Sequence, residues 1–373
     1  MTPSRLNTLT SLRYFFAVGA VAIHLIPVWA NESYSHWPAA FHNLLNAAYI
    51  ALPFFYALSG FVLFYMYRQD MPQRKSQLLY FWGKRFARLA PIFYLSLMMG
   101  LSVLVAEKGY GTSPREAGSY LLVNLAFLSA WLPESLVINF PTWSVSVEMF
   151  CYFLFPFFLP PIARLSKRSA WAGVLICVGL GAAIQVTAAL AYPALWRWPW
   201  DIAGVSPAVT NFFQLHPLVH LPEFLFGIFL ARAWEQRRPA TDHVADLILL
   251  SGFALIAGML LSGIPWPFLM LTSFLFLPAI GLLLWGGAGK RGRYTLWLEF
   301  PLLLLLGEAS YAVYGFHMPL SYWFSRTLSI SDAPYKMFFL FLSVLTGIAI
   351  FFHRLYELRA RAWLMGRIAG WRS

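Results

Sequence analysis

The sequence predicts an all-α polytopic membrane protein of about ten transmembrane helices. Of its 373 residues, 60% are hydrophobic and only 11% are charged, whereas soluble domains carry roughly 25% charged residues. Apolar runs long enough to cross the hydrocarbon core of a bilayer recur along the whole chain. No stretch long enough for a separate soluble domain lies between them, so we expect a single domain over residues 1–373.

The placement of the basic residues supports the same architecture. The net charge is +12, and 22 of the 27 Lys and Arg residues lie near the N-terminus or in the short segments that follow every second apolar run. This bias is typical of cytoplasmic loops. It predicts a multi-pass protein with both termini cytoplasmic, including a basic C-terminal tail over 354–373. The positive net charge is therefore explained by membrane topology, and a nucleic-acid partner is not expected.

The expected spans follow from this alternation. They are 9–29, 44–67, 86–106, 142–163, 171–192, 216–233, 245–263, 268–286, 302–323 and 337–352. One further apolar run, 120–137, would break the alternation if it also crossed. Because it contains or adjoins Asn124, Pro133 and Glu134, we expect it to be re-entrant or interfacial, covered by protein at depth.

Two features of the sequence argue against a disulfide-stabilised secreted protein. Cys151 and Cys177 both lie inside apolar spans, which makes a disulfide framework unexpected. The first apolar run carries Arg13 and His24 and lacks a small-residue cleavage site, so it does not resemble a cleaved signal peptide.

Ionisable residues inside spans are costly and are functional candidates by default. Arg13 and His24 are eleven residues apart, about 16 Å and close to three turns of one helix. They therefore share one side of the first span, with Arg13 at its cytoplasmic end and His24 in its outer half. Arg13, a cation able to bind phosphate, and His24, a base able to accept a proton, would lie on the same face of this helix. The alternative is an Arg that reaches the interface and a histidine with a purely structural hydrogen bond.

Glu148 lies in the second turn of the span 142–163 and is expected at a depth similar to that of His24. A histidine oriented by a carboxylate can activate a hydroxyl as a nucleophile. The sequence therefore predicts His24 and Glu148 as a catalytic pair. The alternative is a structural glutamate that holds two helices together.

Other ionisable residues are candidates for supporting roles. Arg85 and Arg88 lie three residues apart at the start of a span and could bind phosphates. For this segment alone, ordinary cytoplasmic charge or contact with anionic lipid is the favoured interpretation. Tyr311, His317 and Glu223 are further candidates for an acceptor or supporting site. No metal site is expected, because no span carries two histidines four residues apart.

Six segments together resemble the acyltransferase 3 family of bacterial membrane O-acyltransferases. They occur in the order found in that family, between about residues 7 and 320. The segments are Arg13-x10-His24, FFYALSGF at 54–61, RFARLAP at 85–91, TWSVSVE at 142–148, PEFLFG at 222–227 and SYAVYGFH at 310–317. Two departures from the family pattern are Gly315, where a bulky residue is usual, and His220, where an Arg is frequent.

The resemblance implies a transferase in the bacterial cytoplasmic (inner) membrane, with cytoplasmic acetyl-CoA or another acyl-CoA as co-substrate and no tightly bound cofactor. The implied acceptor is a hydroxyl of a cell-surface, secreted or lipid-linked glycan. On matching positions, His24 corresponds to the catalytic base and Glu148 to its supporting carboxylate. Arg13, Arg85 and Arg88 correspond to ligands of the donor phosphates.

Two other functions remain open at this point. A proton-coupled transporter or flippase of a glycan or lipid-linked precursor could use His24, Glu148 and His317 as a proton relay. The absence of a visible internal repeat counts against it. A non-catalytic membrane scaffold is the second alternative. The sequence does not distinguish acetyl from longer acyl donors.

Overall fold

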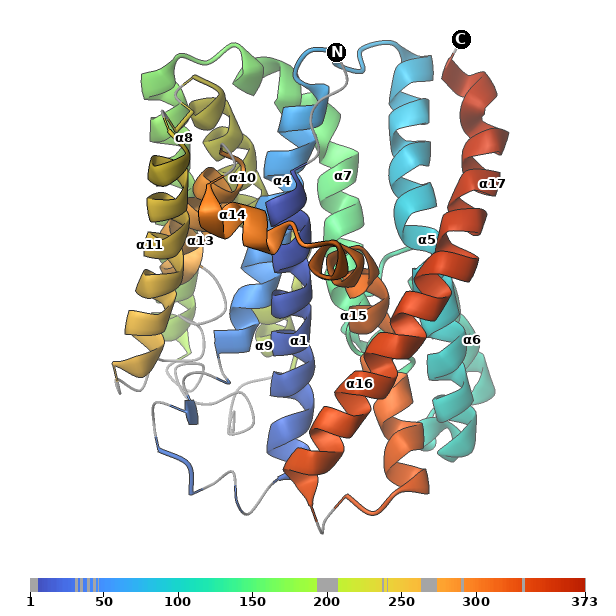
Figure 1. The fold of residues 1–373 in the computed structure, drawn as a ribbon. Helices are drawn as coiled ribbons and strands as arrows, with labels where there is room; N and C mark the ends of the chain where they lie inside the picture. The colour runs from blue at the N-terminus through green and yellow to red at the C-terminus, as the bar shows by residue number, and fades with distance from the viewer. Residues whose placement is uncertain are drawn as a thin grey trace. The chain divides into compact units, whose positions relative to one another are not determined.

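The computed structural model of the chain is built from helices, and no strand occurs among the residues it describes (Figure 1). The described residues are 6–30, 33, 36–38, 41–42, 45, 47–192, 207–236, 238–239, 241–262, 274–289, 292–330 and 333–372. The elements are α1 (Asn7–Trp29), η1 (Ala47–Ile50), α4 (Ala51–Tyr67), α5 (Lys75–Ala106), η2 (Lys108–Gly111), α6 (Pro114–Leu125), η3 (Pro133–Val137), α7 (Thr142–Ala163), α8 (Lys167–Ala191), α9 (Pro207–Leu215), α10 (Pro217–Gln236), α11 (Asp242–Leu261), η5 (Phe274–Phe276), α13 (Leu277–Gly287), α14 (Arg293–Leu298), α15 (Pro301–Thr327), α16 (Pro334–Phe352), η6 (His353–Glu357), α17 (Leu358–Ile368) and η7 (Ala369–Arg372).

The prediction of an all-α, multi-pass membrane protein is confirmed. Within the described residues, seven helical stretches are long and apolar enough to cross a membrane. They are Asn7–Trp29, Lys75–Ala106, Thr142–Ala163, Lys167–Ala191, Ala208–Gln236, Asp242–Leu261 and Pro334–Ile368. Three predicted spans have no counterpart among the seven. Parts of 44–67 and 268–286 lie outside the described residues, and 302–323 lies on the fully described helix α15 (Pro301–Thr327). The number of ten spans therefore stays a prediction.

The apolar run 120–137 is interrupted and does not form one continuous helix. Its expected re-entrant or interfacial position stays a prediction. Helix α6 ends at Leu125, and the backbone then turns at Phe127, whose φ is 57°. Buried Asn124 holds this turn: its side-chain amide donates to the carbonyl of Ser135 at 2.9 Å, and its Oδ1 accepts from Thr142 Oγ1 at 3.0 Å. These bonds pair backbone and side-chain polar groups that an interrupted helix would otherwise leave unsatisfied at depth.

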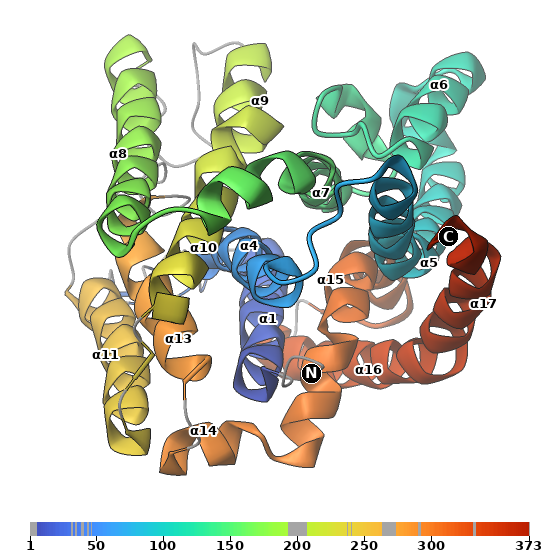
Figure 2. The ribbon, with the colours of Figure 1, turned by 90° about the horizontal axis from the view of Figure 1, so that it is seen from above.

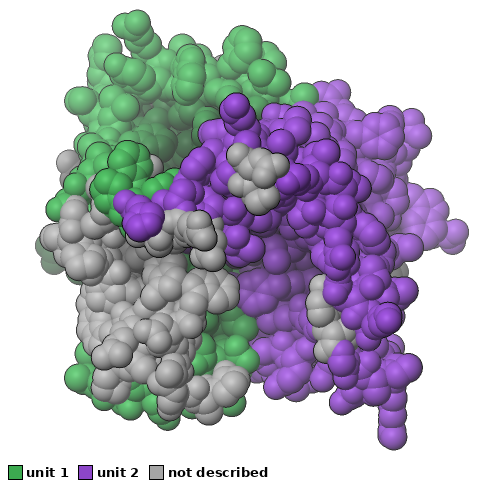
Figure 3. Space-filling model, turned by 90° about the horizontal axis from the view of Figure 1, so that it is seen from below, with its two compact units in different colours: residues 1–20, 37–71, 154–307 green, residues 21–36, 72–153, 308–373 purple. Residues whose placement is uncertain are grey.

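The chain divides into two compact units, coloured separately in Figure 3. The first comprises residues 1–20, 37–71 and 154–307, and the second comprises 21–36, 72–153 and 308–373. Each unit is therefore assembled from segments far apart in the sequence. The expectation of a single domain stays a prediction.

In the first unit, α10 packs against α4 and α8, and Figure 2 shows α10 beside α4. Glycines permit the close approach of α4 and α10. A Cβ on Gly60 would overlap the carbonyl oxygen of Phe224, and a Cβ on Gly227 would overlap that of Ala57. Small residues at such crossings are the usual means by which membrane helices pack, because lipid provides little apolar driving force for association.

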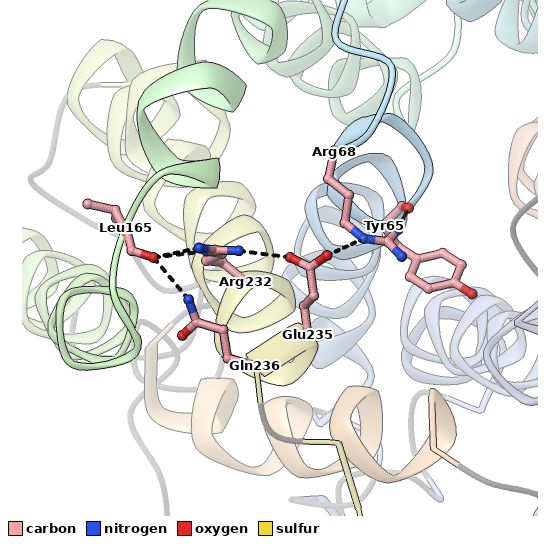
Figure 4. Close-up of polar contacts among 6 residues, drawn as sticks. All are labelled: Tyr65, Arg68, Leu165, Arg232, Glu235 and Gln236. Atoms are coloured by element: carbon pink, nitrogen blue, oxygen red, sulfur yellow. Dashed lines mark hydrogen bonds and ion pairs between the residues drawn. The ribbon is translucent and has the colours of Figure 1, made fainter.

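In the first unit, two arginines form hydrogen bonds and ion pairs with a backbone carbonyl and a carboxylate (Figure 4). Arg232 donates from Nε and Nη2 to the carbonyl of Leu165, at 3.0 and 2.8 Å, and Gln236 donates to the same oxygen at 2.9 Å. Glu235 accepts from Arg232 at 3.0 Å and from Arg68 Nε at 2.6 Å. Two arginines that the sequence interprets as topological charge thus also fix the α7–α8 connection to the ends of α4 and α10.

In the second unit, helix α17 packs along α5. The C-terminal helix continues past the predicted end at residue 352, through the π-helical turn η6 and into α17. At the other end of α5, the Tyr322 hydroxyl and the Arg326 guanidinium donate to Glu107, and they hold the pKa of that carboxyl below its usual range.

The crossing of α4 and α10 gives the first prediction. Gly227→Ala should destabilise the protein by about 1–3 kcal/mol, the usual range for overpacking, because the new methyl meets backbone that cannot move aside. Gly258→Ala on α11 is the matched control, since a Cβ there meets nothing within 4 Å, and it should stabilise by up to about 1 kcal/mol. Thermal unfolding in detergent measures both changes. Equal melting temperatures for the two variants would contradict this account of the crossing.

Candidate active site

Two histidines from distant parts of the chain meet in the second unit. His24 Nδ1 of α1 lies 2.8 Å from His317 Nε2 of α15. Their rings are nearly parallel, with an interplanar angle of 6° and centroids 5.0 Å apart. The rings of Phe140 and His24 are nearly perpendicular, with centroids 6.0 Å apart. His317 is fully buried, whereas His24 retains partial exposure.

The backbone determines which ring nitrogens carry hydrogen. His317 Nδ1 lies 2.6 Å from the carbonyl oxygen of Tyr314, and a carbonyl can only accept. His317 Nδ1 must therefore donate, which leaves Nε2 of the neutral ring as an acceptor. His24 Nδ1 must then donate to His317 Nε2. The one consistent arrangement of neutral rings leaves His24 Nε2 without a hydrogen and able to accept a proton.

This arrangement gives His24 the properties of a general base. A base needs a free lone pair, a fixed ring orientation and a partner that stabilises the protonated form. The chain of hydrogen bonds from Tyr314 through His317 supplies the second and third of these.

The partner of His24 differs from the predicted one. The described hydrogen bond of Glu148 comes from the Tyr152 hydroxyl, one turn further along α7. Glu148 also lies within electrostatic range of Arg88, Tyr152 and Tyr311. The sequence predicts similar depths for the two residues, but counting along a helix does not determine the side toward which a residue points. The hydrogen-bonding partner of His24 is therefore His317, and Glu148 instead lies near Arg88.

The predicted donor-binding residues Arg85 and Arg88 lie near Tyr152, Tyr311 and Glu148. These five residues are called the arginine group below. Arg85 Cζ is 5.9 Å from the ring centroid of Tyr152, and Arg88 Cζ is 5.9 Å from that of Tyr311. The Tyr311 hydroxyl donates to the carbonyl of Leu89 at 3.3 Å, which fixes the ring beside Arg88. The structure therefore brings two of the three predicted phosphate ligands together.

Glu357 adjoins the arginine group and is missing from the residues selected in the sequence. Arg88 Nη1 donates to Glu357 Oε1, with the two side chains 19% and 1% exposed. Glu357 Oε2 lies 2.8 Å from His353 Nδ1. The sequence placed Glu357 in a basic tail, and a carboxylate four residues after a histidine was the signal that could have identified it. The π-helical turn that spans the two residues is of a kind frequent at functional sites.

The remaining two candidates belong to the first unit. Arg13 lies on the part of α1 that belongs to it. Glu223 is buried on α10, and its Oε2 lies 3.1 Å from His220 Nδ1, while His220 Nε2 donates to the carbonyl of Gln214 at 2.8 Å. Glu223 therefore forms a local pair with the histidine that departs from the family pattern.

No group of three or more His, Cys, Asp or Glu side chains suited to a metal ion occurs among the described residues.

Comparison with known proteins identifies the family. The sequence profile of the acyltransferase 3 family, described as an acyltransferase domain, matches residues 6–353. The chain belongs to the acyltransferase 3 family. It is an acyl-transferring enzyme of the membrane, and the histidine pair and the arginine group lie within or next to the matched region.

Two relatives extend the comparison. The chain is 27% identical to the acyltransferase MdmB of Streptomyces mycarofaciens over 334 residues, which cover 84% of this chain and 78% of that protein. It is 25% identical to protein 2 in the picA locus of Rhizobium radiobacter over 204 residues, which cover 50% of this chain and 96% of that protein. No solved structure is significantly similar to the chain.

The buried ion pair gives the second prediction. Glu357→Gln should destabilise this acyltransferase by about 3 kcal/mol, because it removes the buried carboxylate that is hydrogen-bonded to the largely buried Arg88 guanidinium. Glu107→Gln is the matched control, since its partner Arg326 is 61% exposed, and its loss should be much smaller because solvent screens such pairs. Chemical or thermal unfolding in detergent measures the difference. Similar small losses in both variants would show that Glu357 does not hold Arg88.

Proposed function

We propose that this acyltransferase moves an acyl group from a cytoplasmic acyl-CoA to a hydroxyl of a cell-surface, secreted or lipid-linked glycan, with His24 as the general base. The single observation that supports this most strongly is the hydrogen-bond chain from the Tyr314 carbonyl through His317 to His24. It leaves His24 Nε2 as a fixed, unprotonated nitrogen within a protein that belongs to an acyltransferase family.

The arginine group supports an acyl-CoA donor. Coenzyme A carries phosphates, and guanidinium groups bind phosphates through paired, charge-assisted hydrogen bonds. Arg85 and Arg88 lie three residues apart on α5, in the half of the helix that follows a basic segment. In this proposal Glu357 and Tyr311 position Arg88, and the donor binds from the cytoplasmic side. Arg13 is a further candidate ligand.

The chemical step follows from the tautomer of His24. The acceptor hydroxyl binds at His24 Nε2, which takes its proton as the oxygen attacks the thioester carbonyl carbon. The carbon–oxygen bond forms, the carbon–sulfur bond breaks, and the departing thiolate recovers the proton from His24. The products are an ester and free coenzyme A. His317 stabilises the transient imidazolium by accepting from its Nδ1–H.

The third prediction tests the enzymatic role directly. In purified protein reconstituted with a glycan fraction of the host, label from radiolabelled acetyl-CoA should enter the glycan. His24→Ala should lower the rate by about 10²- to 10⁴-fold, the usual contribution of a general base. The measurement is label in the isolated glycan together with release of free coenzyme A.

The control is His243→Ala, which removes an exposed histidine on α11 and should leave the rate unchanged. Glycan that moves across the membrane without acquiring label would favour a transporter instead. Label transfer that survives His24→Ala would reject this base.

A further inference from the structure

A proline removes one backbone hydrogen bond of α15 close to the two histidines. In an α-helix each carbonyl accepts from the N–H four residues further along the chain. For the carbonyl of Gly315 that residue is Pro319, which has no N–H. Helix α15 nevertheless continues to Thr327. The Gly315 carbonyl therefore needs a donor from outside the regular helical pattern.

Asn139 supplies this donor. It lies three residues before the start of α7 at Thr142, and it is 3% exposed. Its Nδ2 donates to the carbonyl of Gly315 at 3.1 Å and, more weakly, to that of Ser96 at 3.4 Å. Both partners are carbonyl oxygens, which can only accept, so the NH2 group of the amide must point toward them. The side chain of Asn139 thus replaces the N–H that Pro319 lacks.

The same segment of the second unit also contacts the preceding residue of α15. Ser144 Oγ lies 3.0 Å from the hydroxyl of Tyr314 and 2.9 Å from the carbonyl oxygen of Pro141. Both Ser144 and Tyr314 are buried. Residues 139–144 therefore bind two consecutive residues of α15, Tyr314 through its side chain and Gly315 through its backbone.

An unpaired Gly315 carbonyl would disturb the group that orients the histidines. A helix commonly satisfies a free carbonyl by tightening into a 3₁₀ turn, in which the N–H three residues further along becomes the donor. For Gly315 that N–H belongs to Met318, which in a regular α-helix donates to the carbonyl of Tyr314. The Tyr314 carbonyl accepts from His317 Nδ1. Such a shift would therefore move the acceptor that determines the tautomers of His317 and His24.

We propose that Asn139 is a positioning residue for the general base. Its amide takes the place of the N–H that Pro319 lacks, and so it fixes the turn of α15 that bears the Tyr314 carbonyl. The orientation of the two histidines therefore depends on a side chain from the segment before α7. The inference rests on the proposed function, in which His24 is the base, and adds a residue that acts through Tyr314 and His317.

The test combines removal of the amide with restoration of the missing N–H. Asn139→Leu keeps a side chain of similar size that cannot donate. It should lower kcat for acetyl transfer by about 10- to 100-fold, the effect typical of outer groups that orient functional histidines. It should also give a mixture of His24 tautomers in nitrogen NMR of protein labelled with ¹⁵N-histidine.

Pro319→Ala provides an N–H four residues after Gly315. The double variant Asn139→Leu/Pro319→Ala should therefore recover most of the rate and the single tautomer of His24. A packing role of Asn139 alone would not be relieved by this change on α15. If Asn139→Leu does not fold, Asn139→Ser, whose shorter side chain does not reach the Gly315 carbonyl, takes its place in the same comparison.

The matched control is Asn124→Leu, made with and without Pro319→Ala. Asn124 is another buried asparagine of the second unit, and its amide donates to the carbonyl of Ser135 at 2.9 Å. Any loss of rate in Asn124→Leu should not be recovered by Pro319→Ala, because the new N–H lies on a different helix from the carbonyl that lost its donor.

Two results would overturn the inference. One is an unchanged rate and tautomer in Asn139→Leu, and the other is a loss that Pro319→Ala does not recover. Either result leaves the proposed function intact, provided that the unmodified protein transfers the acetyl group and His24→Ala does not. Absence of transfer by the unmodified protein would overturn the proposed function, and the tautomers of His24 would still test the role of Asn139.

Discussion

A carbonyl oxygen cannot donate a hydrogen bond, and the carbonyl of Tyr314 lies 2.6 Å from His317 Nδ1. This constraint fixes the hydrogen on His317, then the hydrogen on His24 Nδ1, and finally the bare nitrogen at His24 Nε2. The orientation of the base therefore depends on the backbone of α15. A carboxylate partner would bring a negative charge into a buried site, whereas a neutral imidazole anchored to a carbonyl does not.

The charged residues around Arg88 are paired with one another rather than with His24 or His317. Arg88 donates to Glu357, and Glu148 accepts from Tyr152, so both carboxylates have partners other than His24 and His317. Isolated charges would be expensive at such positions, and pairing makes them tolerable. The result is a region of paired charges around Arg88 and a neutral region at the two histidines, and side chains of α15 contribute to both.

The sequence predicted much of this arrangement, for identifiable reasons. Apolar runs and basic segments located most helices, and Asn124, Pro133 and Glu134 singled out 120–137, which the structure shows to be interrupted. His24, Arg85 and Arg88 could be selected because ionisable residues stand out in apolar spans. The partner of His24 could not, because helical spacing gives depth along one helix but not its rotation toward another. Glu357 was missed because its neighbours in the sequence are basic. Only the folded structure shows that this carboxylate, at the end of the π-helical turn that begins at His353, is buried.

The tautomer of His24 can be measured most directly by nitrogen NMR on protein labelled with ¹⁵N-histidine, with His24 assigned by the signals lost in His24→Gln. This account predicts a protonated Nδ1 and an unprotonated Nε2 for His24 at neutral pH, and a mixture of both tautomers when His317 is replaced by alanine. A proton on Nε2 with a bare Nδ1 in the unmodified protein would contradict it.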